Sequence, residues 1–233
     1  RALGIKTRFL ALFHPSKRER REHFLALDDV SVIVEEGEAL GLLGHNGSGK
    51  STLLQIIAGI LVPTRGRVIT RGRIAPLIQL GVGFNPELTG FENIFLNASL
   101  YGFRNSEIRK HLHEIIEFSE LQHFIDTPLK HYSSGMQMRL GFAVAVHLQP
   151  DILLADEILA VGDQAFQEKC HDKIAELRAQ GMTLVFVSHS SAQVEKFCDQ
   201  FVRLHQGRVV ESGRITKNSA EQYSVPTQTF IAS

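Results

Sequence analysis

Residues 44–51 constrain the fold of this chain more than any other segment. They read Gly-His-Asn-Gly-Ser-Gly-Lys-Ser, which fits the pattern G-x-x-x-x-G-K-[ST] of a loop that holds nucleotide phosphates. The apolar run at 39–43 predicts a buried strand before the loop, and residues 51–58 predict a helix after it. Glycines let backbone N–H groups turn toward an anion, and a helix N-terminus adds partial positive charge. The alternative, a glycine-rich turn without a ligand, does not explain the Lys and Ser that end the octet.

The positions of this loop have expected roles toward a nucleotide and its metal ion. Lys50 would reach the β- and γ-phosphates, and the Ser51 hydroxyl would bind Mg²⁺. The predicted phosphate-binding residues are Gly44, His45, Asn46, Gly47, Ser48, Gly49, Lys50, Ser51 and Thr52.

Composition limits the class of protein. The 233 residues are enough for one large domain or two small ones, and 43% of them are apolar. A formal net charge of zero argues against a dedicated nucleic-acid binder. The only two cysteines, Cys170 and Cys198, lack metal-ligand spacing and indicate apolar filler in a reducing compartment. No apolar stretch approaches 18 residues, so we expect no membrane span and a cytoplasmic location.

The first 23 residues are strongly basic. They hold seven Lys and Arg residues against two Glu residues. One interpretation is a solvated arm with a short helix near 7–13. The other is a contact with anionic lipid headgroups or with a partner protein.

Hydrophobic periodicity predicts an α/β domain. Strands are expected at 25–36, at 151–155, at 183–187, at 201–204 and at 208–211, with one or two more within 67–78. Residues 87–148 read as helical, with an amphipathic helix at 106–118, and further helices are expected at 163–180 and 191–198. A nucleotide domain with a parallel sheet and a helical insertion fits this order. The tail at 218–233 is rich in Ser, Thr and Gln and is expected to be loosely ordered.

Acidic and imidazole side chains follow two of the predicted strands. Asp156 and Glu157 come directly after the apolar run 152–155, at the strand end where α/β sheets place ligands. Asp156 would hold Mg²⁺, and Glu157 would accept a proton from the attacking water or orient it. The alternative is that both acids cap the next helix. His189 follows the next apolar strand and is assigned a contact with the γ-phosphate.

A serine-glycine pair opens the predicted helix that ends near residue 148. In Tyr132-Ser133-Ser134-Gly135-Met136-Gln137, a hydroxyl and backbone N–H groups would face an anion. The order of phosphate loop, Ser-Gly-x-Gln signature, hydrophobic-Asp-Glu and His resembles the nucleotide-binding subunit of ABC transporters. The resemblance covers roughly residues 24–215.

The resemblance implies a fold and a domain division. The fold would be α/β, a P-loop NTPase (RecA-like) mixed-sheet core with an ABC antiparallel β-subdomain and an inserted helical subdomain. The ATPase domain would span residues 24–217, with the helical subdomain at about 85–149, between a basic segment at 1–23 and a polar tail at 218–233.

The resemblance also implies site residues and a dimer. In this family two domains pair head to tail around two ATP molecules, so Ser134 and Gly135 would touch the γ-phosphate held by the other chain. Ser133, Met136 and Gln137 complete the signature, and Asp163 matches the loop that communicates across the dimer. The usual signature is Leu-Ser-Gly-Gly-Gln, from which this chain departs at Ser133 and Met136.

Two further assignments follow from the resemblance. Gln79 matches the glutamine that senses the γ-phosphate and the membrane subunit and contributes to the metal site, although the stretch from Gln79 to Thr89 is one residue longer than usual. Phe24 is the nearest candidate for the aromatic side chain that stacks on adenine, and the alternative is a core position.

Finer matches indicate one branch of the family. Residues 80–94, 132–136 and 156–163 resemble the ATPases that export O-antigen, capsule and teichoic acid polysaccharides of bacterial envelopes. This implies an ATP hydrolase coupled to transport, a homodimer with a transmembrane permease subunit, a lipid-linked glycan as cargo and a peripheral location on the cytoplasmic face of the inner membrane.

Three other functions are alternatives to export, and the motifs do not separate the first of them from it. The chain could switch a membrane partner without moving a substrate, act as a soluble ABC protein on ribosomes or DNA, or bind nucleotide without catalysis. Single-domain architecture argues against the second, and Glu157 and His189 argue against the third.

Overall fold

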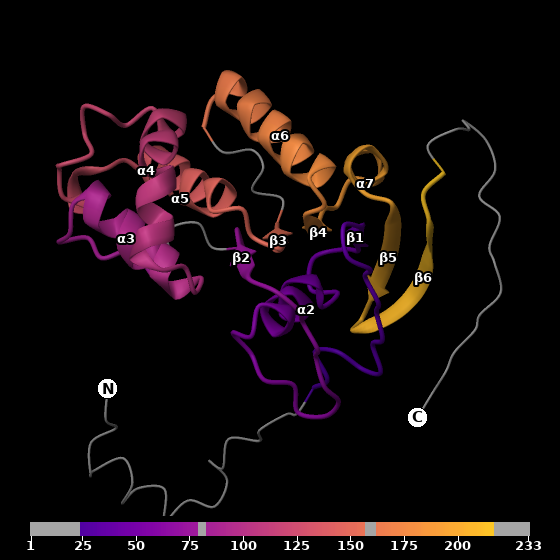
Figure 1. The fold of residues 1–233 in the computed structure, drawn as a ribbon. Coiled ribbons are helices and arrows are strands. Elements are labelled where there is room, and N and C mark those ends of the chain that lie inside the picture. The colour runs from indigo at the N-terminus through magenta and orange to yellow at the C-terminus, as the bar shows by residue number, and fades with distance from the viewer. Residues whose placement is uncertain (1–23, 79–82, 157–161, 217–233) are drawn as a thin grey trace, which may run out of the picture.

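A mixed six-stranded sheet forms the centre of the molecule. The computed structural model describes residues 24–78, 83–156 and 162–216 (Figure 1). The strands are β1 (Ala39–Leu43), β2 (Ile74–Pro76), β3 (Ile152–Ala155), β4 (Thr183–Val187), β5 (Gln200–His205) and β6 (Arg208–Arg214). Their order is β2-β3-β4-β1-β5-β6, and only the β5–β6 pair of these strands is antiparallel. The predicted α/β mixed-sheet core is confirmed.

Helices cover both faces of this sheet. They are α2 (Lys50–Ile57), α3 (Gly90–Leu100), α4 (Asn105–Ser119), α5 (Ser134–His147), α6 (Gln164–Ala179) and α7 (Ser191–Phe197), with a short 3₁₀ turn at Leu129–His131. In Figure 1, α6 and α7 lie on one side of the strands and α2 on the other. The group α3–α4–α5 lies beside the β2 end of the sheet, and all three helices fall within the segment 87–148 expected to be helical.

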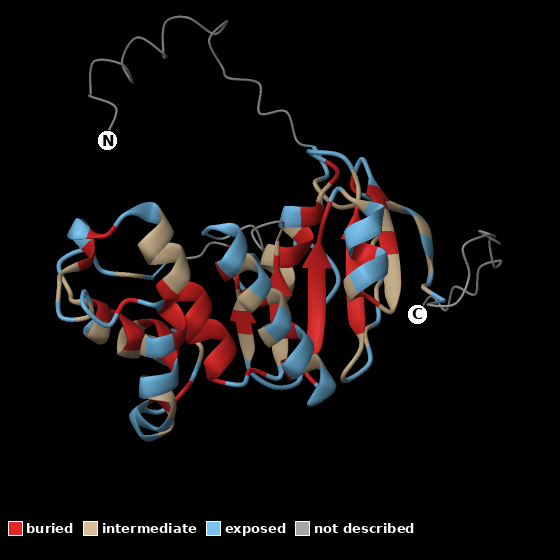
Figure 2. Cartoon of the chain, turned by 90° about the horizontal axis from the view of Figure 1, so that it is seen from above, coloured by how far each residue is buried: buried red, intermediate tan, exposed pale blue. Residues whose placement is uncertain are grey.

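Side-chain alternation along the central strands explains why helices pack on both faces of the sheet. In β4, Leu184 and Phe186 join the core under α6 and α7, whereas Val185 and Val187 pack with Leu54 of α2. All five residues of β4 are buried, as expected for a parallel strand covered on both faces. Figure 2 shows the same pattern, with buried residues concentrated in the strands and in the middle of the helical group.

The strand predicted at 25–36 is wrong. Residues 25–36 are all described and contain no strand. Val30, Val32 and Val34 are half-buried and alternate with exposed neighbours, because they pack on the α2 side of the sheet. Such alternation needs only an extended chain on an apolar surface, whereas a strand also needs a backbone ladder. The left-handed Asp29 (φ 53°) interrupts the extended chain before that run.

The segment 67–78 forms less strand than predicted. Only β2 at Ile74–Pro76 is regular, pairing with β3, and residues 67–73 are exposed. The helices and strands predicted after residue 100 are confirmed, with bounds that shift by no more than four residues. None of the helices in the described ranges is long and apolar enough to cross a membrane. The predicted helix near 7–13 and the tail 218–233 lie outside the described residues.

Candidate nucleotide-binding site

The phosphate loop connects β1 to α2 and closes around a lysine ammonium group. Lys50 is the first residue of α2, and its Nζ atom donates to the backbone oxygens of Gly44 at 2.7 Å and His45 at 3.0 Å. The residue is only 7% exposed, so the positive charge is held inside the loop. Gly49, the N-cap of α2, adopts φ 106°, a conformation that favours glycine. The predicted strand-loop-helix unit is therefore present.

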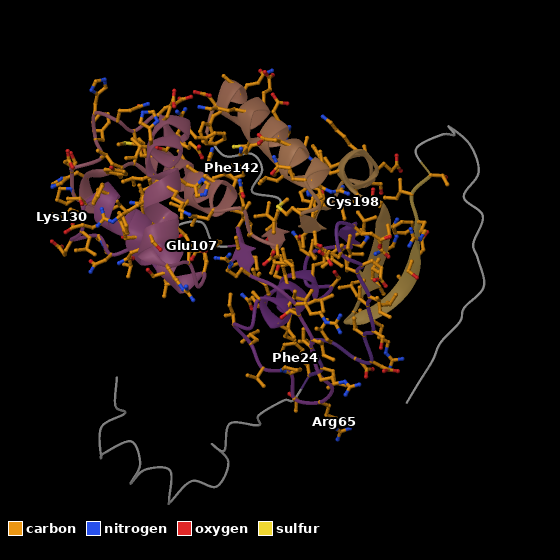
Figure 3. All side chains as sticks on the ribbon, in the orientation of Figure 1. Phe24, Arg65, Glu107, Lys130, Phe142 and Cys198 are labelled. Carbon is orange, nitrogen blue, oxygen red and sulfur yellow. The ribbon has the colours of Figure 1, made fainter. Side chains whose placement is uncertain are left out.

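A cleft of about 440 Å³ opens beside this loop. It is lined by Phe24, Ala26, Asn46, Gly47, Gly49, Lys50, Ser51 and Thr52. Its volume falls in the range of small-molecule sites. Phe24 is 85% exposed on its rim, and Figure 3 shows it near α2. The core alternative for Phe24 is wrong, because its ring faces solvent and the cleft.

The loop has the chemistry expected of an anion site. The Ser48 hydroxyl oxygen is buried and has no hydrogen-bond partner in the part of the chain that the structure describes. Ser48 is not among the residues that line the cleft, where Lys50, Ser51 and Thr52 present their polar groups. The backbone N–H groups in the first turn of α2 also have no acceptor within the helix, because no helical residue precedes them by four positions. The residues present thus fit a nucleotide with its phosphates.

Three strand ends meet at this edge of the sheet. β4 lies between β1 and β3, with Leu42 opposite Val187 and Ala155 opposite Phe186. Because the strands are parallel, their carboxyl ends align, and Asp156 and His189 follow two of them beside the phosphate loop. Asp156 is half-buried and His189 is exposed. The structure thus brings both residues to the predicted edge, while Glu157 and Gln79 lie outside the described residues.

The signature segment begins α5. Ser133 is the N-cap, and its hydroxyl oxygen accepts from the Met136 N–H group at 3.2 Å. Its own O–H proton stays available to donate. Ser134 is exposed, and a Cβ at Gly135 would meet only the Ser133 hydroxyl oxygen, at 3.8 Å. Ser134 is the predicted phosphate contact, and the cap geometry brings the Ser133 hydroxyl to the start of the helix as well.

Two other side chains of this segment make hydrogen bonds within the chain. The Gln137 side-chain amide donates to the Leu129 oxygen at 3.4 Å, and the buried Tyr132 hydroxyl donates to the Phe124 oxygen at 2.7 Å. In Figure 1, α5 belongs to the group with α3 and α4, on the far side of β2 from α2. The signature and the phosphate loop are therefore carried by different parts of the molecule.

Asp163 connects the signature helix to α6. It is the N-cap of α6: one carboxylate oxygen accepts from the Phe166 N–H group at 3.0 Å, and the other accepts from Arg139 at 3.0 Å. Arg139 of α5 also donates to Glu120 at 2.5 Å and lies 4.7 Å from the Phe166 ring centroid. Sequence reasoning missed Arg139, because no motif identifies the partner of an isolated arginine.

The fold and the site define a class: an α/β nucleotide-binding domain with a phosphate loop at the carboxyl edge of its sheet. Residues 27–160 match the family described as ABC transporter, so the chain belongs to the ABC transporter family. It is an ATPase of the type that forms the ATP-binding subunits of these transporters, and proteins of this type bind ATP and ADP.

Two named relatives are about half identical to this chain. The O-antigen export system ATP-binding protein RfbB of Klebsiella pneumoniae is 49% identical over 213 residues, which are 90% of this chain and 85% of that protein. The teichoic acids export ATP-binding protein TagH of Listeria monocytogenes is 50% identical over 202 residues, which are 87% of this chain but only 60% of that protein.

Solved structures share the fold. An ATP-binding subunit of an ABC transporter has a TM-score of 0.74 and 29% identity, covering 82% of this chain and 84% of its own. The ATP-binding cassette MJ0796, solved as a dimer in a post-hydrolysis state with ADP and Pi, has a TM-score of 0.72 and 28% identity, covering 84% of this chain and 93% of its own.

Proposed function

We propose that this ATPase powers export of a lipid-linked polysaccharide, of the O-antigen, capsule or teichoic acid type, across the cytoplasmic membrane. The observation that carries the proposal is the near-50% identity to RfbB and TagH, which are named for the export of two different envelope glycans. Both cargoes are glycans, so the shared sequence favours glycan export as the class of transport.

The residues of the site have separate tasks in this proposal. Lys50 and the N–H groups of the phosphate loop bind the β- and γ-phosphates, and Phe24 faces the base. Glu157 orients the attacking water and takes its proton, and His189 donates to the γ-phosphate. Ser51, Asp156 and Gln79 would hold Mg²⁺, which neutralises phosphate charge when bound.

A second copy of the chain completes the site. The exposed first turn of α5 (Ser133, Ser134 and Gly135) donates to the γ-phosphate bound by the partner copy, and Asp163 lies at the contact between the copies. The dimeric state named for MJ0796 supports this arrangement. Closing on the triphosphate moves the helical groups of both copies and the permease subunits docked on them, and hydrolysis reopens the dimer. The chain would therefore act peripherally, at the cytoplasmic face of the inner membrane.

Cells carrying Lys50→Ala test this function. We expect undelivered lipid-linked glycan to accumulate inside them and surface glycan to disappear, because the variant cannot hold the phosphates. Glu157→Gln should give the same phenotype, with ATP still bound but hydrolysed about 10²-fold more slowly. The control is Lys173→Ala, which removes a lysine of α6 that pairs with Glu176. Surface glycan at the wild-type level in the Lys50→Ala strain would overturn the proposal.

A further inference from the structure

The turn that joins β5 to β6 lies against the phosphate loop. The Gly207 N–H group donates to the backbone oxygen of Ser48 at 2.9 Å. A Cβ at Gly44 would lie 2.4 Å from the Leu204 oxygen, so the end of β5 also presses on the start of the loop. The loop is therefore backed by a hairpin from the C-terminal part of the domain.

The same turn also holds the segment that carries Phe24. The Gly207 oxygen accepts from the Asp28 N–H group at 2.8 Å, and the Arg208 guanidinium group pairs with the Asp28 carboxylate. Phe24 and Ala26 of this segment line the cleft opposite the loop residues. One turn thus contacts both walls of the cleft.

Two glycines leave room for the backbone of Ala26 between these walls. Its oxygen would lie 2.8 Å from a Cβ on Gly207 and 2.9 Å from a Cβ on Gly49. Gly207 has φ 78° and Gln206 has φ 47°, the paired positive values of a tight hairpin turn. Any side chain on Gly207 would therefore push the segment that carries Ala26 and Phe24 away from the turn.

We infer that the β5–β6 turn is a positioning element that fixes Phe24 and Ala26 relative to the phosphate loop. It thereby sets the affinity for the base end of the nucleotide. The inference rests on the proposed assignment of this cleft to a nucleotide. Arg208 contacts Asp28 and therefore positions only the segment that carries Phe24, which would face the base. Gly207 acts on both sides, through Ser48 and through Asp28.

Binding of ATP and of tripolyphosphate separates these effects, since tripolyphosphate has no base. Calorimetric titration of the full chain would compare wild type with Arg208→Ala. We expect the Kd for ATP to rise about threefold to fivefold, the upper part of the range for loss of one exposed ion pair. The Kd for tripolyphosphate should stay unchanged.

Arg214→Ala is the matched control. Arg214 lies on the same strand, its side chain is 72% exposed against 71% for Arg208, and it pairs with Glu38 at 2.9 Å. We expect it to bind both ligands as wild type does. The inference is overturned if Arg208→Ala and Arg214→Ala bind ATP equally well, or if tripolyphosphate weakens as much as ATP in Arg208→Ala.

Gly207→Ala should weaken the binding of both ligands about tenfold. A Cβ at residue 207 would lie 2.8 Å from the Ala26 oxygen, and the turn also bonds to the phosphate loop. An unchanged Kd for ATP in this variant contradicts the inference. If Gly207→Ala does not fold, the comparison of Arg208→Ala with Arg214→Ala still tests the inference.

Amide hydrogen exchange distinguishes failure of the inference from failure of the proposed function. Should wild type bind neither ligand, the nucleotide assignment of the cleft is wrong. In that case the positioning role is tested by the rate of amide exchange in the peptide covering residues 24–28, measured without ligand. We expect faster exchange in Arg208→Ala than in Arg214→Ala, and equal rates overturn the role of the turn.

Discussion

Gly41 lies in the middle of β1, where α7 crosses the strand at close range. A Cβ at Gly41 would lie 2.2 Å from Cγ1 of Val194, a residue that is almost completely buried. This contact brings α7 down onto the strand that ends in the phosphate loop. Neither the apolar run at 39–43 nor its glycine reveals the partner, since the contact joins segments far apart in the chain.

The packing at this point predicts the outcome of one substitution and its rescue. Gly41→Ala should lower the free energy of unfolding by about 1–3 kcal/mol, the usual cost of overpacking a core. Denaturant titration measures the loss. In the double variant with Val194→Ala, the loss should be clearly smaller than the sum of the two single losses. Simple additivity would show that the clash is not the cause.

At the level of elements, α5 and α6 are joined by a charged cluster rather than by apolar contacts alone. Besides Arg139, the ammonium group of Lys169 donates to the Phe118 oxygen at 3.0 Å and to Glu120 at 3.3 Å. It also lies 4.6 Å from the Phe118 ring centroid. Glu120 is the left-handed C-cap of α4, so this cluster joins the end of α4 to both other helices.

Removing the central arginine should loosen this junction. Arg139→Ala should cost about 1–2 kcal/mol of stability, the combined range for a networked ion pair and a stacked cation. Arg109→Ala is a suitable control, because Arg109 also stacks on a ring, Phe95, at 5.4 Å from its centroid. Thermal unfolding of both variants measures the difference. Equal shifts in Tm would contradict a special role for the cluster.

For the whole molecule, the buried His147 and the half-buried His171 link stability to pH. Burial lowers the pKa of His147, whose Nδ1 atom lies 3.0 Å from the Ala143 oxygen and whose ring packs edge-on against Phe118. Burial likewise lowers the pKa of His171. The folded state thus favours neutral imidazoles, whereas the unfolded chain takes up protons near the ordinary value of 6.5.

Stability should therefore fall as the pH drops below about 6.5. His147→Gln should flatten this dependence between pH 5 and pH 6.5, even though the variant loses some stability at every pH. Urea titration at several pH values measures the slope, with the exposed His123 as the control for substitution. An unchanged slope in His147→Gln would exclude His147 as a source of the effect.

The sequence predicted those parts of the site that depend on local order along the chain. The octet at 44–51 and the residues after two apolar strands were identified, because parallel strands bring their carboxyl ends to one edge. The segment 25–36 was misjudged, since alternation does not tell whether a neighbouring strand is present. Arg139 and Gly207 were missed, because their partners are set only by the folded chain.

The position of β1 between β4 and β5 has a consequence for how the protein is made. β1 is synthesised early, yet its two neighbours are residues 183–187 and 200–205. Both of its edges therefore stay unpaired on the ribosome until residues 183–205 have emerged. Pairing between such distant segments is slow to form. The nascent chain thus carries an unpaired apolar strand while the long segment between β1 and β4 is made, and such an edge is prone to aggregate until its neighbours arrive.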